Sequence, residues 1–130
     1  MSDPWKDVRG LALKIVDLGR TVVFFLPQLK LMESMVGEKT VEQHLKEFLL
    51  EEYGAFSVNH QPALRLMYNQ GQSLVVENCE RYEVMITGKK SIAQLVSKLA
   101  CLAVIMDEPS IYFKVGEDAC LIKPPPRAAR

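Results

Sequence analysis

Residues 21–26 read TVVFFL, and this stretch decides the fold. It is short and rich in β-branched and aromatic residues, and Pro27 follows it directly, which is typical of a strand rather than a helix. Both faces of the stretch are apolar, so both need to be covered by other parts of the protein. We therefore expect Thr21–Leu26 to be a central strand of a sheet.

One helix is predicted before this strand and a weaker one after it. Asp3 followed by Pro4 is a cap and first-turn signal, and apolar residues at helical spacing extend the helix from about Pro4 to Leu18. Residues 28–36 are weakly helical, because their apolar side chains are spaced by three and four. The N-terminal helix is thus an addition that precedes the main series of elements.

Two longer helices have clearer start signals. Thr40 and Gln43 match the capping box, in which a threonine and a glutamine satisfy each other's backbone donors, and an apolar stripe follows up to Tyr53. Ser91 caps the second helix, whose stripe reaches Met106. This second helix is apolar enough that we expect it to be well buried.

The pattern changes from helical to alternating between residues 55 and 87. Alternation in residues 64–68 and again in residues 81–87 predicts two antiparallel neighbours, each with one more polar face. Residues 69–72 have turn chemistry. The link from Gly71 to Asn78 is either a wide hairpin loop or a pair of strand extensions with a bulge.

The C-terminal part completes an α+β fold. Residues 111–115 and 119–122 alternate on either side of a glycine turn and predict a small hairpin arm. From residue 20 to residue 123 the order strand–helix–strand–strand–helix–strand is that of a ferredoxin-like split βαβ sandwich, a four-stranded antiparallel sheet with two helices on one face. Residues 1–123 then form a single α+β domain, and the proline-rich residues 124–130 form a disordered tail.

Composition excludes several classes of protein. Hydrophobic residues make up 48% and charged residues 25%, which is typical of a globular chain and not of a disordered one. The 16 basic residues balance the 16 acidic ones, so no net field attracts nucleic acid or anionic lipid. The longest apolar run, Leu99–Met106, is too short to span a bilayer, and three widely spaced cysteines do not suggest a disulfide framework. We therefore expect a cytoplasmic protein that does not bind membranes.

The sequence has no recognisable catalytic or metal-binding motif. His44 and His60 are the only histidines, and neither has the spacing of a metal ligand, so we expect no metal and no cofactor. Cys101 and Cys120 lie in apolar stretches and are expected to pack as small hydrophobic side chains, whereas Cys79, among polar neighbours, is the best candidate for an exposed thiol. An enzyme whose site is assembled from scattered residues would leave no linear motif, so that alternative stays open.

Residues 88–91 offer one candidate ligand site. Lys89, Lys90, the Ser91 hydroxyl and free backbone donors meet at one helix N-terminus, which favours a small anion. A plain serine cap explains the same residues.

An RNA-binding sheet is a minor alternative. Tyr112 and Lys114 share a strand face, as do Arg81 and Glu83, but neither strand matches the RNP1 consensus of RRM domains. The balanced charge of the chain also makes nucleic acid an unlikely partner.

The second face of the sheet gives the strongest functional signal in the sequence. Met67 and Met85 alternate away from the core, onto the face of Phe25, and such an apolar face needs a cover. Either the N-terminal helix, through Trp5, covers it or a second subunit does. We therefore predict a small non-catalytic interaction or regulatory module that self-associates through this face as a homodimer or binds a protein partner. The alternative is a domain that binds a small anionic ligand at the Gly88–Ser91 turn.

Overall fold

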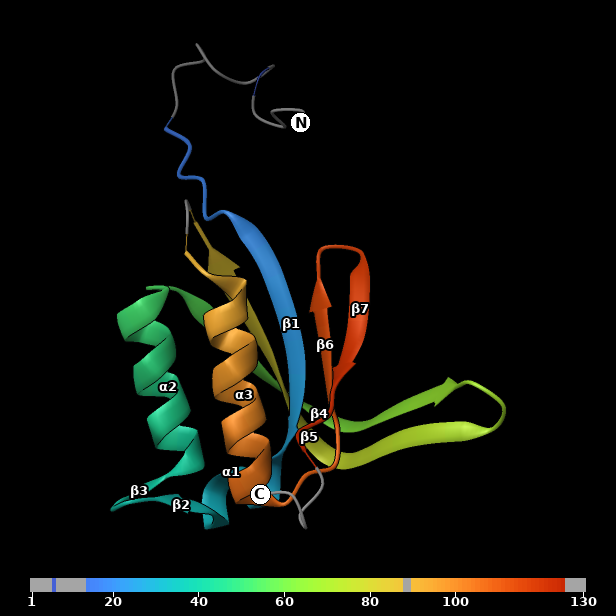
Figure 1. The fold of residues 1–130 in the computed structure, drawn as a ribbon. Coiled ribbons are helices and arrows are strands. Elements are labelled where there is room, and N and C mark those ends of the chain that lie inside the picture. Colours follow the sequence, from blue (N-terminus) through green and yellow to red (C-terminus); the bar gives the residue numbers. More distant parts are fainter. Residues whose placement is uncertain (1–5, 7–13, 88–89, 126–130) are drawn as a thin grey trace.

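The computed structural model of the chain describes residue 6, residues 14–87 and residues 90–125. These residues form a mixed α+β fold with a five-stranded antiparallel sheet, a separate two-stranded hairpin and three helices (Figure 1). The elements in chain order are β1 (Arg20–Pro27), α1 (Gln28–Glu33), β2 (Met35–Val36), β3 (Lys39–Thr40), α2 (Val41–Glu52), β4 (Phe56–Tyr68), β5 (Gln72–Ile86), α3 (Ile92–Met106), β6 (Ile111–Val115) and β7 (Asp118–Ile122).

The large sheet has the strand order β4-β5-β1-β6-β7. Within it β1 pairs with β5 on one side and with β6 on the other, so that Phe24 lies opposite both Tyr82 and Phe113. This confirms that residues 21–26 form a central strand beside residues 81–87. The sheet has five strands instead of the predicted four, because β7 pairs with β6 and extends the sheet at that edge.

The main core lies between this sheet and two helices, α2 and α3, which pack side by side on one of its faces (Figure 1). The rings of Phe24 and Tyr82 stack there with their centroids 5.2 Å apart. Phe48 is only partly buried, because it lies at the surface between the helices with Lys98 Nζ 5.0 Å from its ring centroid. Other large side chains of the sheet and the two helices are buried: Phe24, Leu45, Val84, Ile86, Leu95, Leu99 and Phe113.

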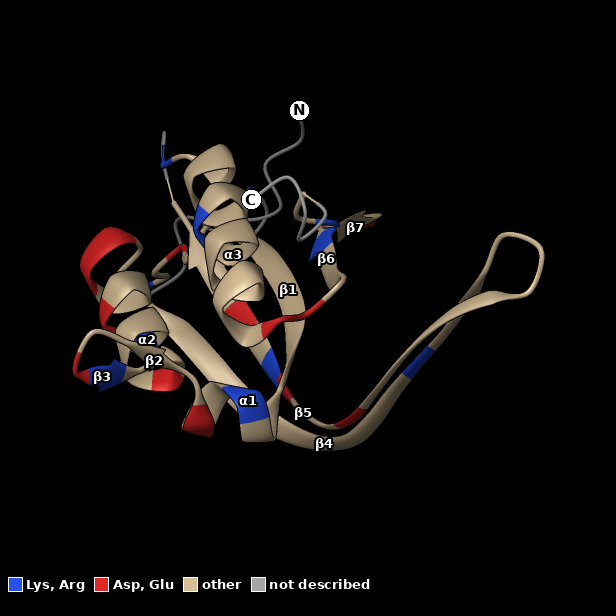
Figure 2. Cartoon of the chain, turned by 60° about the horizontal axis from the view of Figure 1, so that its bottom comes forward, with Lys and Arg blue, Asp and Glu red and all other residues tan. Residues whose placement is uncertain are grey.

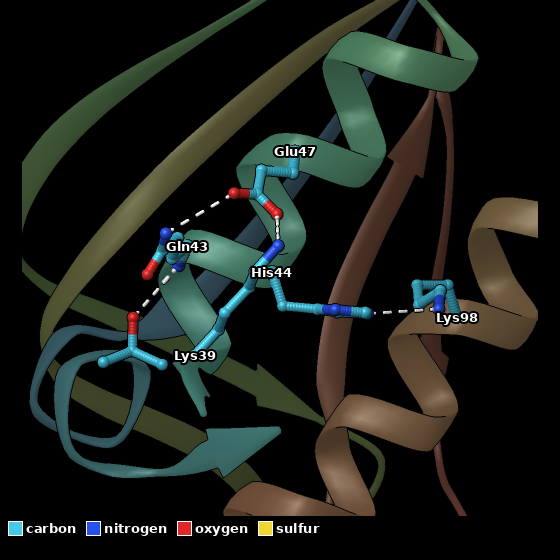
Figure 3. Close-up of polar contacts among 6 residues, drawn as sticks. Lys39, Gln43, His44, Glu47 and Lys98 are labelled. Carbon is cyan, nitrogen blue, oxygen red and sulfur yellow. Dashed lines mark hydrogen bonds and ion pairs between the residues drawn. The ribbon is translucent and has the colours of Figure 1, made fainter. Parts of the chain in front are cut away.

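Both of the longer helices start where the capping signals predict. The Thr40 hydroxyl accepts a hydrogen bond from the backbone N–H of Gln43 at 3.1 Å, and the Ser91 hydroxyl accepts one from the N–H of Gln94 at 3.1 Å. The Gln43 side chain donates to Glu47 at 3.4 Å (Figure 3). Of the two hydrogen bonds of a capping box, the structure therefore shows the one that the Thr40 side chain accepts.

The predicted N-terminal helix is not found in the part of it that is described. Residues 14–19 have no regular secondary structure, and Trp5, like most of the predicted helix, lies outside the described residues. Ile15, Val16 and Leu18 are exposed by 38%, 66% and 51%. Their apolar stripe has no packed surface to bury it, and a short helix without tertiary packing is marginal in water.

The segment after β1 also differs from the prediction. Helical spacing through residue 36 predicts one weak helix, whereas α1 ends at Glu33 and is followed by the two-stranded hairpin β2–β3. Gly37 in the turn of this hairpin has a φ of 62°, which a glycine adopts readily. The turn therefore reverses the chain before α2 begins.

β4 and β5 are longer than predicted, with 13 and 15 residues. They continue to a tight turn at residues 69–71, so strand extension is the correct one of the two alternatives for this link. The ladder between the strands omits the pair of Pro62 and Asn78, where proline has no N–H to donate and asparagine has a φ of 48°. Beyond this point the hairpin bends out of the plane of the sheet (Figures 1 and 2), and we call its residues 63–77 the β4–β5 arm.

The β4–β5 arm packs against the second face of the sheet. Leu74 and Val76 of the arm are buried together with Cys79, which lies just beyond the bend. Even-numbered residues of β5 such as Tyr82 face the main core, whereas Leu74 and Val76 of the arm belong to the second cluster, so the strand presents its other side to the protein beyond Asn78. The partly buried side chains around this second cluster are Phe25, Leu64, Leu66, Tyr68, Tyr112 and Leu121. Part of the second face is thus covered by the chain's own hairpin.

Candidate functional site

A cleft of about 450 Å³ lies on the second face of the sheet, beside the β4–β5 arm. Its floor comes from β1, β5 and β6, and the arm adds two leucines to its wall. The lining residues are Thr21, Val23, Phe25, Leu64, Leu66, Arg81, Glu83, Tyr112, Lys114 and Gly116. The volume lies in the range of known small-molecule sites.

Strand register arranges this floor in rows. Val23 lies opposite Glu83 on one side and opposite Lys114 on the other, so these three side chains stand on one face in one row. In the next row Phe25 lies opposite Arg81, and its ring centroid is 5.8 Å from that of Tyr112. Since neighbouring strands are about 4.8 Å apart, Glu83 and Lys114 flank an apolar strip roughly 10 Å wide between their backbones.

The charges of the cleft do not balance. Arg81 Nη2 donates to Glu83 Oε1 at 3.2 Å, and the two side chains are 28% and 35% exposed. In the described part of the chain no carboxylate forms an ion pair with Lys114. Two cationic groups against one carboxylate leave the cleft with one formal positive charge, which favours a ligand that has a negatively charged group.

The residues that the sequence predicted for an interface do not form one surface. Phe25 lines the cleft, and Met85 is half-buried on the same strand face as Glu83. Met67 is 72% exposed on the outer side of the arm, because the bend directs that side away from the sheet. Trp5 lies outside the described residues.

The predicted anion site at residues 88–91 is described only in part. Gly88 and Lys89 lie outside the described residues. Lys90 is exposed, and the Ser91 hydroxyl caps α3 through the N–H of Gln94. Anion binding at this turn stays a prediction.

The exposure of the three cysteines is the reverse of what the sequence predicted. Cys79 is buried under the arm, whereas Cys101 on α3 and Cys120 on β7 are exposed. The bend after Asn78 is the reason, since it brings the arm over a position whose sequence neighbours are polar. Burial raises the pKa of the Cys79 thiol, so this thiol is a poor nucleophile in the folded protein.

The two histidines lie apart from the cleft and from each other. His44 Nε2 is 3.2 Å from Lys98 Nζ, between α2 and α3 (Figure 3). His60 Nδ1 is 3.6 Å from Glu80 Oε1 on the neighbouring strand. Among the described residues, no group of three or more His, Cys, Asp or Glu side chains could hold a metal ion. The same part of the chain has no helix that is both long enough and apolar enough to cross a membrane.

The sequence showed which side chains of the cleft share a strand face, but it did not show the cleft itself. The alternation showed that Arg81 and Glu83 share one strand face and that Tyr112 and Lys114 share another. Only the pairing of β1 with both strands brings the two pairs to opposite sides of one floor.

Comparisons with known proteins give two similar structures. The first is a phage SAM lyase in complex with S-methyl-5'-thioadenosine, at 18% identity and a TM-score of 0.49, covering 87% of this chain and 95% of that one. The second is a phage SAM lyase in the apo state, at 17% identity and a TM-score of 0.49, covering 85% of this chain and 94% of that one. No family model and no curated protein matches the sequence.

The structure corrects the basis of the function predicted from the sequence, a non-catalytic interaction or regulatory module that self-associates through a sheet face. Both similar structures are described as SAM lyases and neither as such a module. The apolar second face, which was to be covered by a partner or by the N-terminal helix, is partly covered by the β4–β5 arm and contains a cleft with charged side chains.

Proposed function

We propose that this chain is an enzyme whose small-molecule substrate binds in the cleft between the second face of the sheet and the β4–β5 arm. The observation that carries the proposal is the meeting of Arg81, Glu83 and Lys114 on an apolar floor in a cleft of about 450 Å³. A mostly apolar cleft with a few convergent polar groups is the usual form of a small-molecule site. The residues come from two strands, and Lys114 is 31 or more positions from the other two in the sequence, which is why no linear motif marks the site.

Each lining group has a distinct role in this proposal. Lys114 binds a negatively charged group of the substrate, and Arg81 holds Glu83 in place through their hydrogen bond of 3.2 Å. Glu83 is the group positioned to exchange a proton with the substrate or to pair with its positive charge. Tyr112 and Phe25 present the aromatic part of the floor, against which a flat apolar group can pack.

The first experiment is a ligand screen on the full chain by thermal shift and by amide chemical shifts. The panel includes SAM and S-methyl-5'-thioadenosine, because both have a flat purine ring for the aromatic floor and SAM also has a carboxylate for Lys114. Binding should shift the amides of residues 81–83 and 112–114. A panel in which no compound shifts these amides contradicts the proposal.

The second experiment separates binding from turnover. Lys114→Met should weaken binding of the ligand found in the screen, whereas Lys46→Met, at a half-exposed lysine of α2, should not. Glu83→Gln should abolish turnover, which is measured by mass spectrometry, while the variant still binds the ligand. Glu117→Gln, in the exposed turn of the C-terminal hairpin, is its matched control. Full turnover by the Glu83 variant would remove the proton-transfer role.

We also infer that the sheet has the ferredoxin-like split βαβ arrangement expected from the sequence. Supporting this are the central positions of β1 and β5 and the two helices, α2 and α3, on one face of the sheet (Figure 1). This arrangement leaves the other face open to the arm and the substrate. A cytoplasmic location remains a prediction.

A further inference from the structure

A second cleft of about 260 Å³ lies beside the first one. Its lining comes from the arm and from the C-terminal hairpin and includes no charged side chain: Leu66, Tyr68, Tyr112, Ala119, Cys120 and Leu121. Lys123 lies at the edge of this region, with its Nζ 5.8 Å from the ring centroid of Tyr68. The second cleft is therefore apolar where the first one is charged.

The two clefts are continuous along the sheet. Leu66 and Tyr112 line both of them, one from the arm and one from the floor. The rows of the floor also continue, because Tyr112 lies opposite Leu121 on β7 and Lys114 lies opposite Ala119. Three strand spacings of about 4.8 Å separate β5 from β7, so the joined floor extends for roughly 14 Å.

We propose that the substrate is an elongated amphipathic anion that occupies both clefts. This inference rests on the proposed function and specifies the class of substrate. Its carboxylate or phosphate group lies at Lys114, in the cleft that has one excess positive charge. Its apolar part crosses Tyr112 and fills the space next to Leu121 in the second cleft.

The chemistry of the lining favours this orientation over the reverse one. A negative group in the second cleft would lose water without gaining a charged partner among the lining residues, which is unfavourable. An apolar group there removes hydrocarbon surface from water on both partners. Each methylene group that becomes buried should raise affinity about fourfold.

Straight-chain carboxylates test this inference on the full-length protein. Affinities of acetate, butanoate, hexanoate and octanoate are measured by calorimetry, with hexanol as the uncharged control. Affinity should rise with chain length by about fourfold for each buried methylene, and hexanol should bind more weakly than hexanoate. Lys114→Met should remove the preference for hexanoate over hexanol, and Lys46→Met should retain it.

Amide chemical shifts locate the apolar end of the ligand in the unaltered protein. Octanoate should shift the amides of Ala119 and Leu121 in the second cleft and leave that of Cys101, which lies on α3, unchanged. The variant Leu121→Glu should abolish the dependence on chain length, and its thermal transition shows whether it folds.

The possible results separate this inference from the proposed function. Equal affinities for all four carboxylates, or octanoate binding that leaves the amides of Ala119 and Leu121 unshifted, would overturn the two-cleft substrate while the first cleft stays a candidate. Equal binding of hexanol and hexanoate would overturn the anionic group. If no carboxylate binds although the ligand screen finds a compound for the first cleft, the substrate class is wrong and the proposed function stands.

Discussion

Replacing Tyr82 by Phe should stabilise the fold, although the residue lies at the centre of the core. The Tyr82 side chain is fully buried, and no group among the described residues forms a hydrogen bond with its hydroxyl. Its ring stacks on Phe24, and phenylalanine retains that packing. An unsatisfied buried hydroxyl costs about 1–3 kcal/mol of desolvation, so Tyr82→Phe should raise the free energy of unfolding by up to that amount at neutral pH.

The advantage of the variant should grow in alkali. Burial raises the pKa of the Tyr82 phenol in the folded state, and Glu42 and Glu80 raise it further. The unfolded chain has a phenol pKa of about 10, so above this pH the unfolded state releases a proton that the folded state keeps. Wild-type stability therefore falls by about 1.4 kcal/mol per pH unit above about pH 10 from this group, and the variant does not undergo this loss.

Tyr53 provides the matched control with the opposite sign. Its hydroxyl donates a hydrogen bond to the backbone carbonyl of Ser91 at 2.7 Å, linking the end of α2 to the start of α3. Tyr53→Phe leaves this carbonyl without its donor and should destabilise the fold by about 1–2 kcal/mol.

Urea titrations of the three proteins at about pH 7 and about pH 11 measure these differences, with m-values compared to confirm that unfolding is two-state. A Tyr82→Phe variant that loses as much stability as Tyr53→Phe would mean that the Tyr82 hydroxyl has a hydrogen-bond partner. A difference between wild type and Tyr82→Phe that does not change with pH would mean that the phenol ionises normally in the folded protein.

Two further stability predictions follow from the packing. Leu99→Ala, at a fully buried position of α3, should cost about 2–5 kcal/mol in a urea titration, and Leu50→Ala, at a side chain 57% exposed on α2, less than about 1 kcal/mol; similar losses would contradict the assigned helix faces. Gly19→Ala should cost more than Gly54→Ala, although both glycines have a φ above 80°, because a Cβ at Gly19 would lie 2.2 Å from the carbonyl oxygen of Ile86 and one at Gly54 meets nothing within 4 Å. Equal losses for the two glycines would show that the segment before β1 moves aside at no cost.

The elements that the sequence predicted correctly are those fixed by local chemistry. The apolar stretch at residues 21–26 is a central strand, and Thr40 and Ser91 cap the helices whose stripes follow them. Capping and periodicity act within a few residues, so the sequence contains the whole signal. The helix predicted for the N-terminal segment was wrong over residues 15–18, because the apolar side chains there are exposed and have no surface among the described residues to pack on.

The candidate site depends on contacts that no local pattern specifies. The bend at Pro62 and Asn78 turns the β4–β5 arm onto the second face, buries Cys79 and exposes Met67. Alternation along β5 could not show this, because a single residue in the left-handed region changes which side of a strand faces the protein.

The order of the strands in the sheet decided which side chains line the cleft. The sequence by itself determined that Glu83 and Lys114 each lie on the more polar face of a strand. Only the tertiary structure placed β1 between those strands and set Val23 opposite both residues, so that a carboxylate and an ammonium group flank one apolar floor. The physical reason is that register between strands distant in the chain is fixed by burial of the opposite face, where Phe24, Tyr82 and the two long helices pack together.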